Sequence, residues 1–172
     1  MQGLRGVINM MNTMNMGNDV LPAPKLNIAG VRIIKLNNIL TRSGLMNEVF
    51  RSSWFADIHI KQINWVELNP QGVTDWHCHA VQIDRLIGVS GNIKLCLLDD
   101  RPESATRGAT DVIRIGIAAP IMVVFPPGIW HGLRNESGAP AAYLNIVEEL
   151  YSHANPDNVS RPSDALEMPI KL

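Results

Sequence analysis

The stretch from Asp75 to Ala80, DWHCHA, carries three consecutive side chains that can bind a metal or move a proton. Successive side chains of a β-strand point to opposite faces. A strand here would therefore put His77 and His79 on one face and turn Cys78 to the other. Three interpretations of the histidines follow: metal ligands, catalytic bases, or polar residues that line the inside of a β-sheet structure.

The chain around this stretch has the pattern of an all-β protein. From Ile58 onward, short runs mostly alternate apolar and polar residues and end at Gly, Pro, Asn or Asp. Such runs are typical of a sandwich or barrel, and runs that are apolar throughout indicate strands buried on both faces. Helix signals are few, and the stretch 47–54 is the best short candidate. The clearest strand runs are 93–97, 113–117, 119–125 and 141–147.

Length and local composition predict one domain preceded by an arm. The chain has 172 residues, enough for one domain with a sizeable core. The prolines of Leu21–Pro24 favour an extended linker, so we expect an N-terminal arm over 1–24 and a barrel domain over 25–172. The arm holds five of the eight methionines but is interrupted by asparagines. We expect it to be flexible or packed on a partner, not a secretory signal.

Charge and cysteine content exclude several partner classes. A formal net charge of −1 gives no electrostatic reason to expect nucleic acid or an anionic membrane as a partner. No run approaches the roughly 20 apolar residues needed to span a bilayer. Cys78 and Cys96 are too few for a disulfide framework, so we expect core-filling thiols and a cytoplasmic location.

Two groups of polar residues resemble the two cupin motifs, which lie on facing strands of a jelly-roll barrel. The first group spans Gly72–Gly91 and the second spans Pro126–Asn135. The resemblance implies a single cupin jelly-roll barrel, the double-stranded β-helix. Three imidazoles and one carboxylate also suit a divalent Zn, Fe, Ni or Mn ion. The candidate metal ligands are His77, His79, Asp84 and His131. Trp76 and Trp130 each precede a motif histidine, so we expect both to point away from the site.

A closer resemblance covers most of the chain. The stretch 91–108, GNIKLCLLDDRPESATRG, is similar to the signature of the dTDP-4-dehydrorhamnose 3,5-epimerase family of nucleotide-sugar epimerases. Two further segments of this family resemble the stretches 125–135 and 42–50. The resemblance implies an epimerase or isomerase for a dTDP-4-keto-6-deoxyhexose, with no required cofactor. It also implies a homodimer, with the methionine-rich arm and the strand within 23–36 at the contact.

The family's chemistry assigns roles to individual residues. Epimerising a carbon beside a ketone needs a base that removes a weakly acidic proton. The resemblance implies that His77 is this base and that Asp164 orients it. It places Arg42 and Glu48 at the nucleotide end, where an arginine suits a pyrophosphate. The substrate contacts implied near the sugar are Asp99, Arg101, His131 and Asn145.

The chain departs from the family pattern in ways that keep alternatives open. His79 stands where the family has glutamine, Asp84 where it has lysine, and Asn145 where it has the proton-donating tyrosine. An asparagine amide does not transfer a proton at neutral pH. The site is therefore either a metal-free site with His77 as base or a divalent-metal site that polarises the carbonyl. The rival function is a non-catalytic or metal-dependent sugar-binding cupin, and Asp99 with Arg101 could be a structural ion pair.

Overall fold

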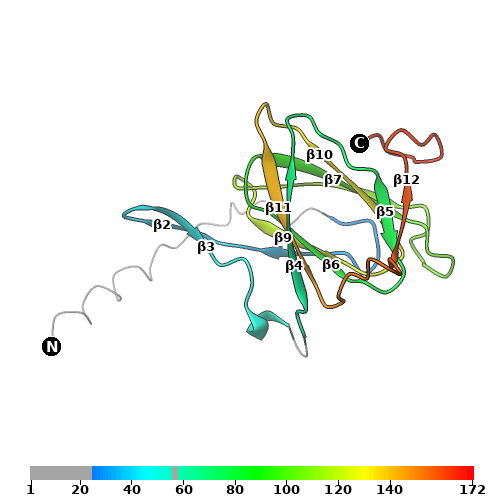
Figure 1. The fold of residues 1–172 in the computed structure, drawn as a ribbon, viewed down its shortest axis with the longest axis horizontal. Helices are drawn as coiled ribbons and strands as arrows, with labels where there is room; N and C mark the ends of the chain where they lie inside the picture. Colours follow the sequence, from blue (N-terminus) through cyan, green and yellow to red (C-terminus); the bar gives the residue numbers. More distant parts are fainter. Residues whose placement is uncertain (1–24, 56–57) are drawn as a thin grey trace.

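The computed structural model describes residues 25–55 and 58–172, so the predicted arm over 1–24 lies outside the described residues. The described chain is nearly all β, as the sequence pattern predicts (Figure 1). No helix in these ranges is long and apolar enough to cross a membrane. The strands are β1 (Arg32–Lys35), β2 (Asn38–Thr41), β3 (Gly44–Asn47), β4 (Gln62–Leu68), β5 (Trp76–His79), β6 (Asp84–Gly88), β7 (Asn92–Asp99), β8 (Thr110–Gly116), β9 (Ile121–Phe125), β10 (Ile129–Asn135), β11 (Ala141–Val147) and β12 (Asn158–Arg161).

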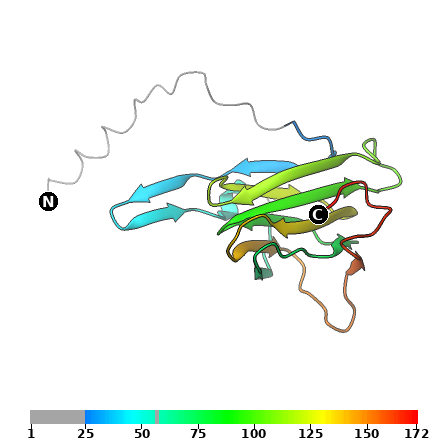
Figure 2. The same cartoon turned by 90° about the horizontal axis from the view of Figure 1, so that it is seen from above.

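Two five-stranded antiparallel sheets pack against each other as the walls of a jelly-roll barrel. One sheet has the order β1-β9-β6-β11-β4 and the other has the order β12-β5-β10-β7-β8. Figure 2 shows the two layers from above, with the β2–β3 hairpin extending beyond them. The all-β, single-barrel prediction is confirmed for the described residues. The strand expected within 23–36 forms β1, which pairs with β9 of the same chain.

The apolar runs of the sequence fill the space between the sheets. In β9 every residue from Met122 to Phe125 is buried, which explains why this run shows no alternation. In β8 buried residues alternate with exposed ones, because one face of this strand meets solvent. The largest cluster contains Leu86, Ile93, Leu95, Leu97, Val123, Phe125 and Leu133.

A second cluster covers the outer face of the sheet that carries the motif histidines. Trp76 and Trp130 are buried there together, under the C-terminal segment that contains Met168. The expectation that both tryptophans point away from the histidines is confirmed. Cys96 is fully buried in the same cluster, and burial raises the pKa of its thiol, so it fills core space as predicted.

The segment between β3 and β4 differs from its predicted helix. The stretch 47–54 contains only a 3-10 helix over Ser52–Trp54. Asn47 instead ends the β2–β3 hairpin, and Val49 and Phe50 pack on the apolar cluster outside the barrel. Tertiary packing of these apolar side chains overrides a weak local helix signal.

Candidate active site

Strand pairing brings the three motif histidines together inside the barrel. β5 and β10 are neighbours, and His77 pairs directly with His131 in register. The ring of His131 lies 6.1 Å from that of His77 and 5.6 Å from that of His79, between ring centres. It also packs at 5.0 Å on Phe125 of the facing sheet, so these rings occupy the inner face. Cys78 packs toward the outer tryptophan cluster, as strand alternation predicts.

The turn before β10 is tied to β5 by a glycine. Gly128 has a φ of +80°, a conformation that side chains with a Cβ rarely adopt. Its N–H donates to the carbonyl of His79 at 2.8 Å. This bond fixes the entry of β10 beside β5 and thereby the position of His131 relative to the two β5 histidines.

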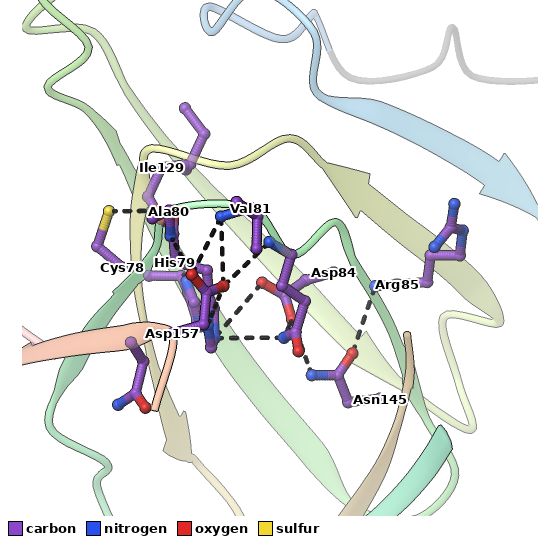
Figure 3. Close-up of polar contacts among 12 residues, drawn as sticks. Cys78, His79, Ala80, Val81, Asp84, Arg85, Ile129, Asn145 and Asp157 are labelled. Carbon is purple, nitrogen blue, oxygen red and sulfur yellow. Dashed lines mark hydrogen bonds and ion pairs between the residues drawn. The ribbon is translucent and has the colours of Figure 1, made fainter. Parts of the chain in front are cut away.

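The facing sheet supplies a buried carboxylate. Asp84, at the start of β6, is only 1% exposed. Its Oδ1 accepts hydrogen bonds from Gln82 Nε2 at 2.7 Å and from Asn145 Nδ2 at 2.8 Å. Its Oδ2 lies 3.9 Å from His79 Nε2. The two sheets therefore meet through polar groups at this end of the barrel, as Figure 3 shows.

Three of the four predicted metal ligands converge. One ligand atom from each of His79, Asp84 and His131 lies within 4.8 Å of the other two. Nδ1 of His131 lies 3.2 Å from the carbonyl oxygen of Ile129 and can donate to it, which leaves Nε2 free to bind. The donor set therefore fits a divalent first-row ion. His77 lies outside this group.

Burial controls the protonation of two of the histidines. Burial lowers the pKa of His131, and the nearby Asp84 carboxylate opposes this shift only in part. The pKa of His77 is also lowered, first by burial and then by His79, against the opposing charge of Asp75. Both imidazoles are therefore neutral at pH 7, the form that accepts a proton or binds a metal.

Two contributors to the site were not predicted. Gln82 links His79 to Asp84, with its Nε2 3.3 Å from His79 Nε2. Asp157, just before β12, lies with Oδ2 3.5 Å from His79 Nδ1. No local sequence signal marks Asp157, because it reaches the site only through the pairing of β12 with β5.

The structure does not bring Asp164 to His77. The β12 residue opposite His77 is Ser160. Asp164 follows in the segment over the outer tryptophan cluster, where its neighbour Ala165 packs. The carboxylates whose charges act on His77 are those of Asp75 and Asp84. The expected pairing of His77 with Asp164 is therefore absent from the described structure, because the chain turns outward after β12.

The remaining predicted contacts lie in or just after the β2–β3 hairpin and at the end of β7, where Asp99 follows Leu97, the partner of His131, on the same face. Arg42 is exposed in the turn of the projecting β2–β3 hairpin, and Glu48 follows that hairpin and pairs with Arg51 at 3.3 Å. Asp99 is fully buried and forms an ion pair with Arg101 at 2.8 Å. This last arrangement favours the structural interpretation of the Asp99–Arg101 pair.

The curated proteins that the chain resembles are named for glycan or polysaccharide biosynthesis. No protein-family profile matches the chain. It is 29% identical over 143 residues to the probable low-salt glycan biosynthesis epimerase Agl13 of Haloferax volcanii, which covers 82% of this chain and 90% of the relative. It is 28% identical over 137 residues to the spore coat polysaccharide biosynthesis protein SpsL of Bacillus subtilis, covering 80% and 91%.

Solved structures share the fold. A dTDP sugar isomerase from Desulfovibrio desulfuricans G20 has a TM-score of 0.79 at 23% identity, covering 87% of this chain and 94% of that chain. The dTDP-4-dehydrorhamnose 3,5-epimerase of Bacillus anthracis has a TM-score of 0.73 at 15% identity, covering 85% and 86%. The fold is thus the cupin barrel of the sugar epimerases and isomerases. The predicted resemblance to the dTDP-4-dehydrorhamnose 3,5-epimerase family is confirmed, and the relatives support an enzyme of the carbohydrate epimerase and isomerase class.

Proposed function

We propose that the protein is a nucleotide-sugar epimerase or isomerase that acts on a dTDP-4-keto-6-deoxyhexose, with His77 as the base. The observation that carries this proposal is the convergence of His77, His79 and His131 inside a barrel of the epimerase type. His77 is half-buried, and its lowered pKa keeps it neutral at pH 7, as a general base requires. The dTDP-sugar substrate follows from what the structural relatives are named for.

The proposed reaction starts at a carbon beside the ketone. The C–H bond breaks, its proton moves to His77, and its electron pair forms an enolate whose charge lies on the former ketone oxygen. Asn145 does not return the proton, because its amide is hydrogen-bonded to Asp84 and has no acidic proton at neutral pH. Return of a proton to the same carbon from the opposite face inverts that carbon. The ketone moves instead when the hydroxyl on that carbon loses its proton, its oxygen becomes the new carbonyl, and the former carbonyl carbon receives a proton.

Solvent deuterium exchange tests this proposal. The full chain is incubated with dTDP-4-keto-6-deoxyglucose in D₂O, and proton NMR follows each carbon beside the ketone. We expect deuterium at one or both carbons with the wild-type chain, and its loss with His77→Gln. Glu167→Gln, an exposed carboxylate paired with Arg161 at 3.8 Å, is the matched control and should exchange normally. Exchange that His77→Gln leaves unchanged would remove His77 as the base.

A divalent-metal site is the second candidate, favoured by the convergence of His79, Asp84 and His131. These three residues would hold the ion, and a bound ion would supply Lewis acidity toward the substrate carbonyl. Elemental analysis of protein purified without chelator or nickel affinity tests this candidate. We expect about one equivalent for a metal enzyme. Metal well below that, with exchange unchanged by a chelator, would contradict it.

The rival function is a sugar-binding cupin without catalysis. The replacement of the family's tyrosine by Asn145 is the observation that favours it. Tight binding of dTDP-sugars without any deuterium exchange would support this rival, whereas exchange at either carbon would exclude it.

We also propose a homodimer in the cytoplasm. The β2–β3 hairpin exposes apolar side chains, with Leu40 85% exposed, and Trp65 on the edge strand β4 is 70% exposed. A second copy packed on these surfaces would bury them and would give Arg42 and Glu48 a nucleotide to bind in the partner's site. Sedimentation should show a dimer at micromolar concentration, and Leu40→Glu should weaken it. A wild-type monomer would contradict the proposal.

The free thiols of the two cysteines fit a reducing compartment.

A further inference from the structure

Tyr143 is a buried tyrosine inside the barrel to which the proposed reaction gives no role. It lies on β11 two residues before Asn145, so both side chains point to the inner face of the sheet. Tyr143 is 8% exposed and belongs to the cluster between the two sheets. In the described chain, the β11 hydrogen bonds that involve side chains are those of Asn145 and one from Ala142 to Ser90, so the Tyr143 hydroxyl has no partner there. This oxygen is also not one of the fully buried, unpartnered atoms, so it keeps some access to solvent.

Strands β5 and β11 belong to the two facing sheets and begin at the same end of the barrel. Asn135 joins their starts. Its Nδ2 donates to the carbonyl of Ala139 at 2.8 Å, shortly before β11, and its backbone N–H donates to the carbonyl of Gly72 at 2.9 Å, shortly before β5. The two strands therefore run in the same direction from this end.

Asp84 joins the two strands further along. Its Oδ1 accepts from Asn145 of β11 at 2.8 Å, and its Oδ2 lies 3.9 Å from His79 of β5 (Figure 3). Inward-facing positions of a strand are two residues apart, so the next ones toward the common start are Tyr143 and His77. These two side chains therefore lie at the same depth on opposite walls. A sugar held between the walls would present one face of a carbon to His77 and the other face to Tyr143.

We propose that the Tyr143 hydroxyl is the proton donor opposite His77, in the role that Asn145 cannot fill. This proposal rests on the proposed function. Once His77 has removed the proton, the electron pair of the enolate forms a new C–H bond with the Tyr143 proton on the opposite face, and the carbonyl is restored beside an inverted carbon. The remaining phenolate takes a proton from solvent, and His77 releases its own to solvent. Burial, and then the charge of Asp84, raises the pKa of Tyr143 to about 12, so the hydroxyl still holds its proton at pH 7 when the enolate forms.

A comparison of deuterium exchange with inversion tests this role. The full chain is incubated with dTDP-4-keto-6-deoxyglucose in D₂O. Proton NMR of one sample reports deuterium beside the ketone and, from the shifts of the anomeric and methyl protons, the inverted sugar. We expect Tyr143→Phe to exchange within about 3-fold of wild type, because His77 can return a deuteron from its own side, and to invert the carbon roughly 100-fold more slowly. His77→Gln should lose both activities.

Tyr143→Phe keeps the ring in the core and removes a hydroxyl without a partner, so its urea unfolding should match that of wild type. Tyr151→Phe is the matched variant, because Tyr151 is the other tyrosine of the chain and is 44% exposed. Inversion that persists in Tyr143→Phe, or that is lost in Tyr151→Phe instead, would overturn the proposal. Equal loss of exchange and inversion in Tyr143→Phe would also overturn it, since that is the result of a purely structural role. Wild-type exchange without any inverted sugar would overturn it while His77 remains the base, whereas no wild-type exchange would mean that the proposed function itself fails.

Discussion

Two buried aspartates lie at strand ends of this barrel, and their surroundings differ. Asp99, at the end of β7, accepts five hydrogen bonds, shared among Arg101, Ser104 and Thr106, and both of its oxygens are used. Asp84, at the start of β6, receives two side-chain donors on Oδ1. Among the described residues, the contact of its Oδ2 is His79 Nε2 at 3.9 Å.

The difference separates a structural carboxylate from one with capacity left for chemistry. A carboxylate whose lone pairs are all taken by its own loop stabilises that loop and has little left to offer a ligand. The hydrogen bonds from Arg101, Ser104 and Thr106 hold the pKa of Asp99 well below its usual range, which agrees with this role. Asp84 instead keeps an unfilled oxygen among histidines.

The largest expected effect is at the histidine end of the barrel. His77→Gln should reduce deuterium exchange by about 100-fold to 10,000-fold, because a general base contributes a factor of this size. The free energy of unfolding should change by less than about 1 kcal/mol, since His77 is only half-buried. Exchange NMR and urea unfolding measure the two quantities. An exchange rate within a few-fold of wild type would show that His77 is not the general base.

The second-largest expected effect is the loss of stability when Asp99 is replaced. Asp99→Asn should lower the free energy of unfolding by about 2–4 kcal/mol, because Arg101 loses its buried ionic partner. The neighbouring Asp100→Asn is the matched control. That side chain is about half exposed and pairs with Arg107 at 3.7 Å, so about 0.5 kcal/mol or less is expected. Equal effects in urea unfolding would show that Asp99 does not organise its loop.

The dependence of the unfolding free energy on pH also tests the structural role of Asp99. The folded-state pKa of Asp99 is depressed, so its contribution is complete above the unfolded value of about 3.9 and is lost as the pH falls below it. Between pH 5 and 3, the wild-type chain should therefore lose more unfolding free energy than Asp99→Asn does. Parallel slopes for the two proteins would contradict the assignment.

The smallest expected effect comes from one hydroxyl of the Asp99 loop. Ser104 donates to Asp99 Oδ2 at 2.5 Å, so Ser104→Ala should cost about 1 kcal/mol. Ser43→Ala, in the exposed hairpin turn, has no buried partner and should cost close to zero. Thermal unfolding of the two variants gives the difference. A larger cost for Ser43→Ala would contradict the ranking.

The sequence predicts what depends on local periodicity. Alternation in 93–97 and the apolar run 119–125 became β7 and β9, and the spacing of His77 and His79 put both on one face. These outcomes depend on strand geometry, which any strand imposes on its residues. The predicted helix over 47–54 failed because its apolar side chains pack on the barrel instead.

Contacts between distant segments were not predictable in the same way. The tail of the chain contains Asp157 and Asp164, seven positions apart, and resemblance pointed to the second. The register of β12 on β5 places Asn158 opposite His79 and thereby brings Asp157 beside that ring, whereas the role expected for Asp164 concerned His77. Register over such a separation is a property of the assembled sheet.

Deuterium exchange of Asp84→Asn and Asp99→Asn, measured side by side per folded molecule, tests whether Asp84 serves the reaction while Asp99 serves only the fold. We expect Asp84→Asn to lower the exchange rate by about 10-fold to 100-fold, because the charge beside His79 and His131 disappears. Asp99→Asn should keep a rate within about 3-fold of wild type in the fraction that stays folded. A fast Asp84→Asn variant together with a slow, fully folded Asp99→Asn variant would show that the roles of the two aspartates are reversed.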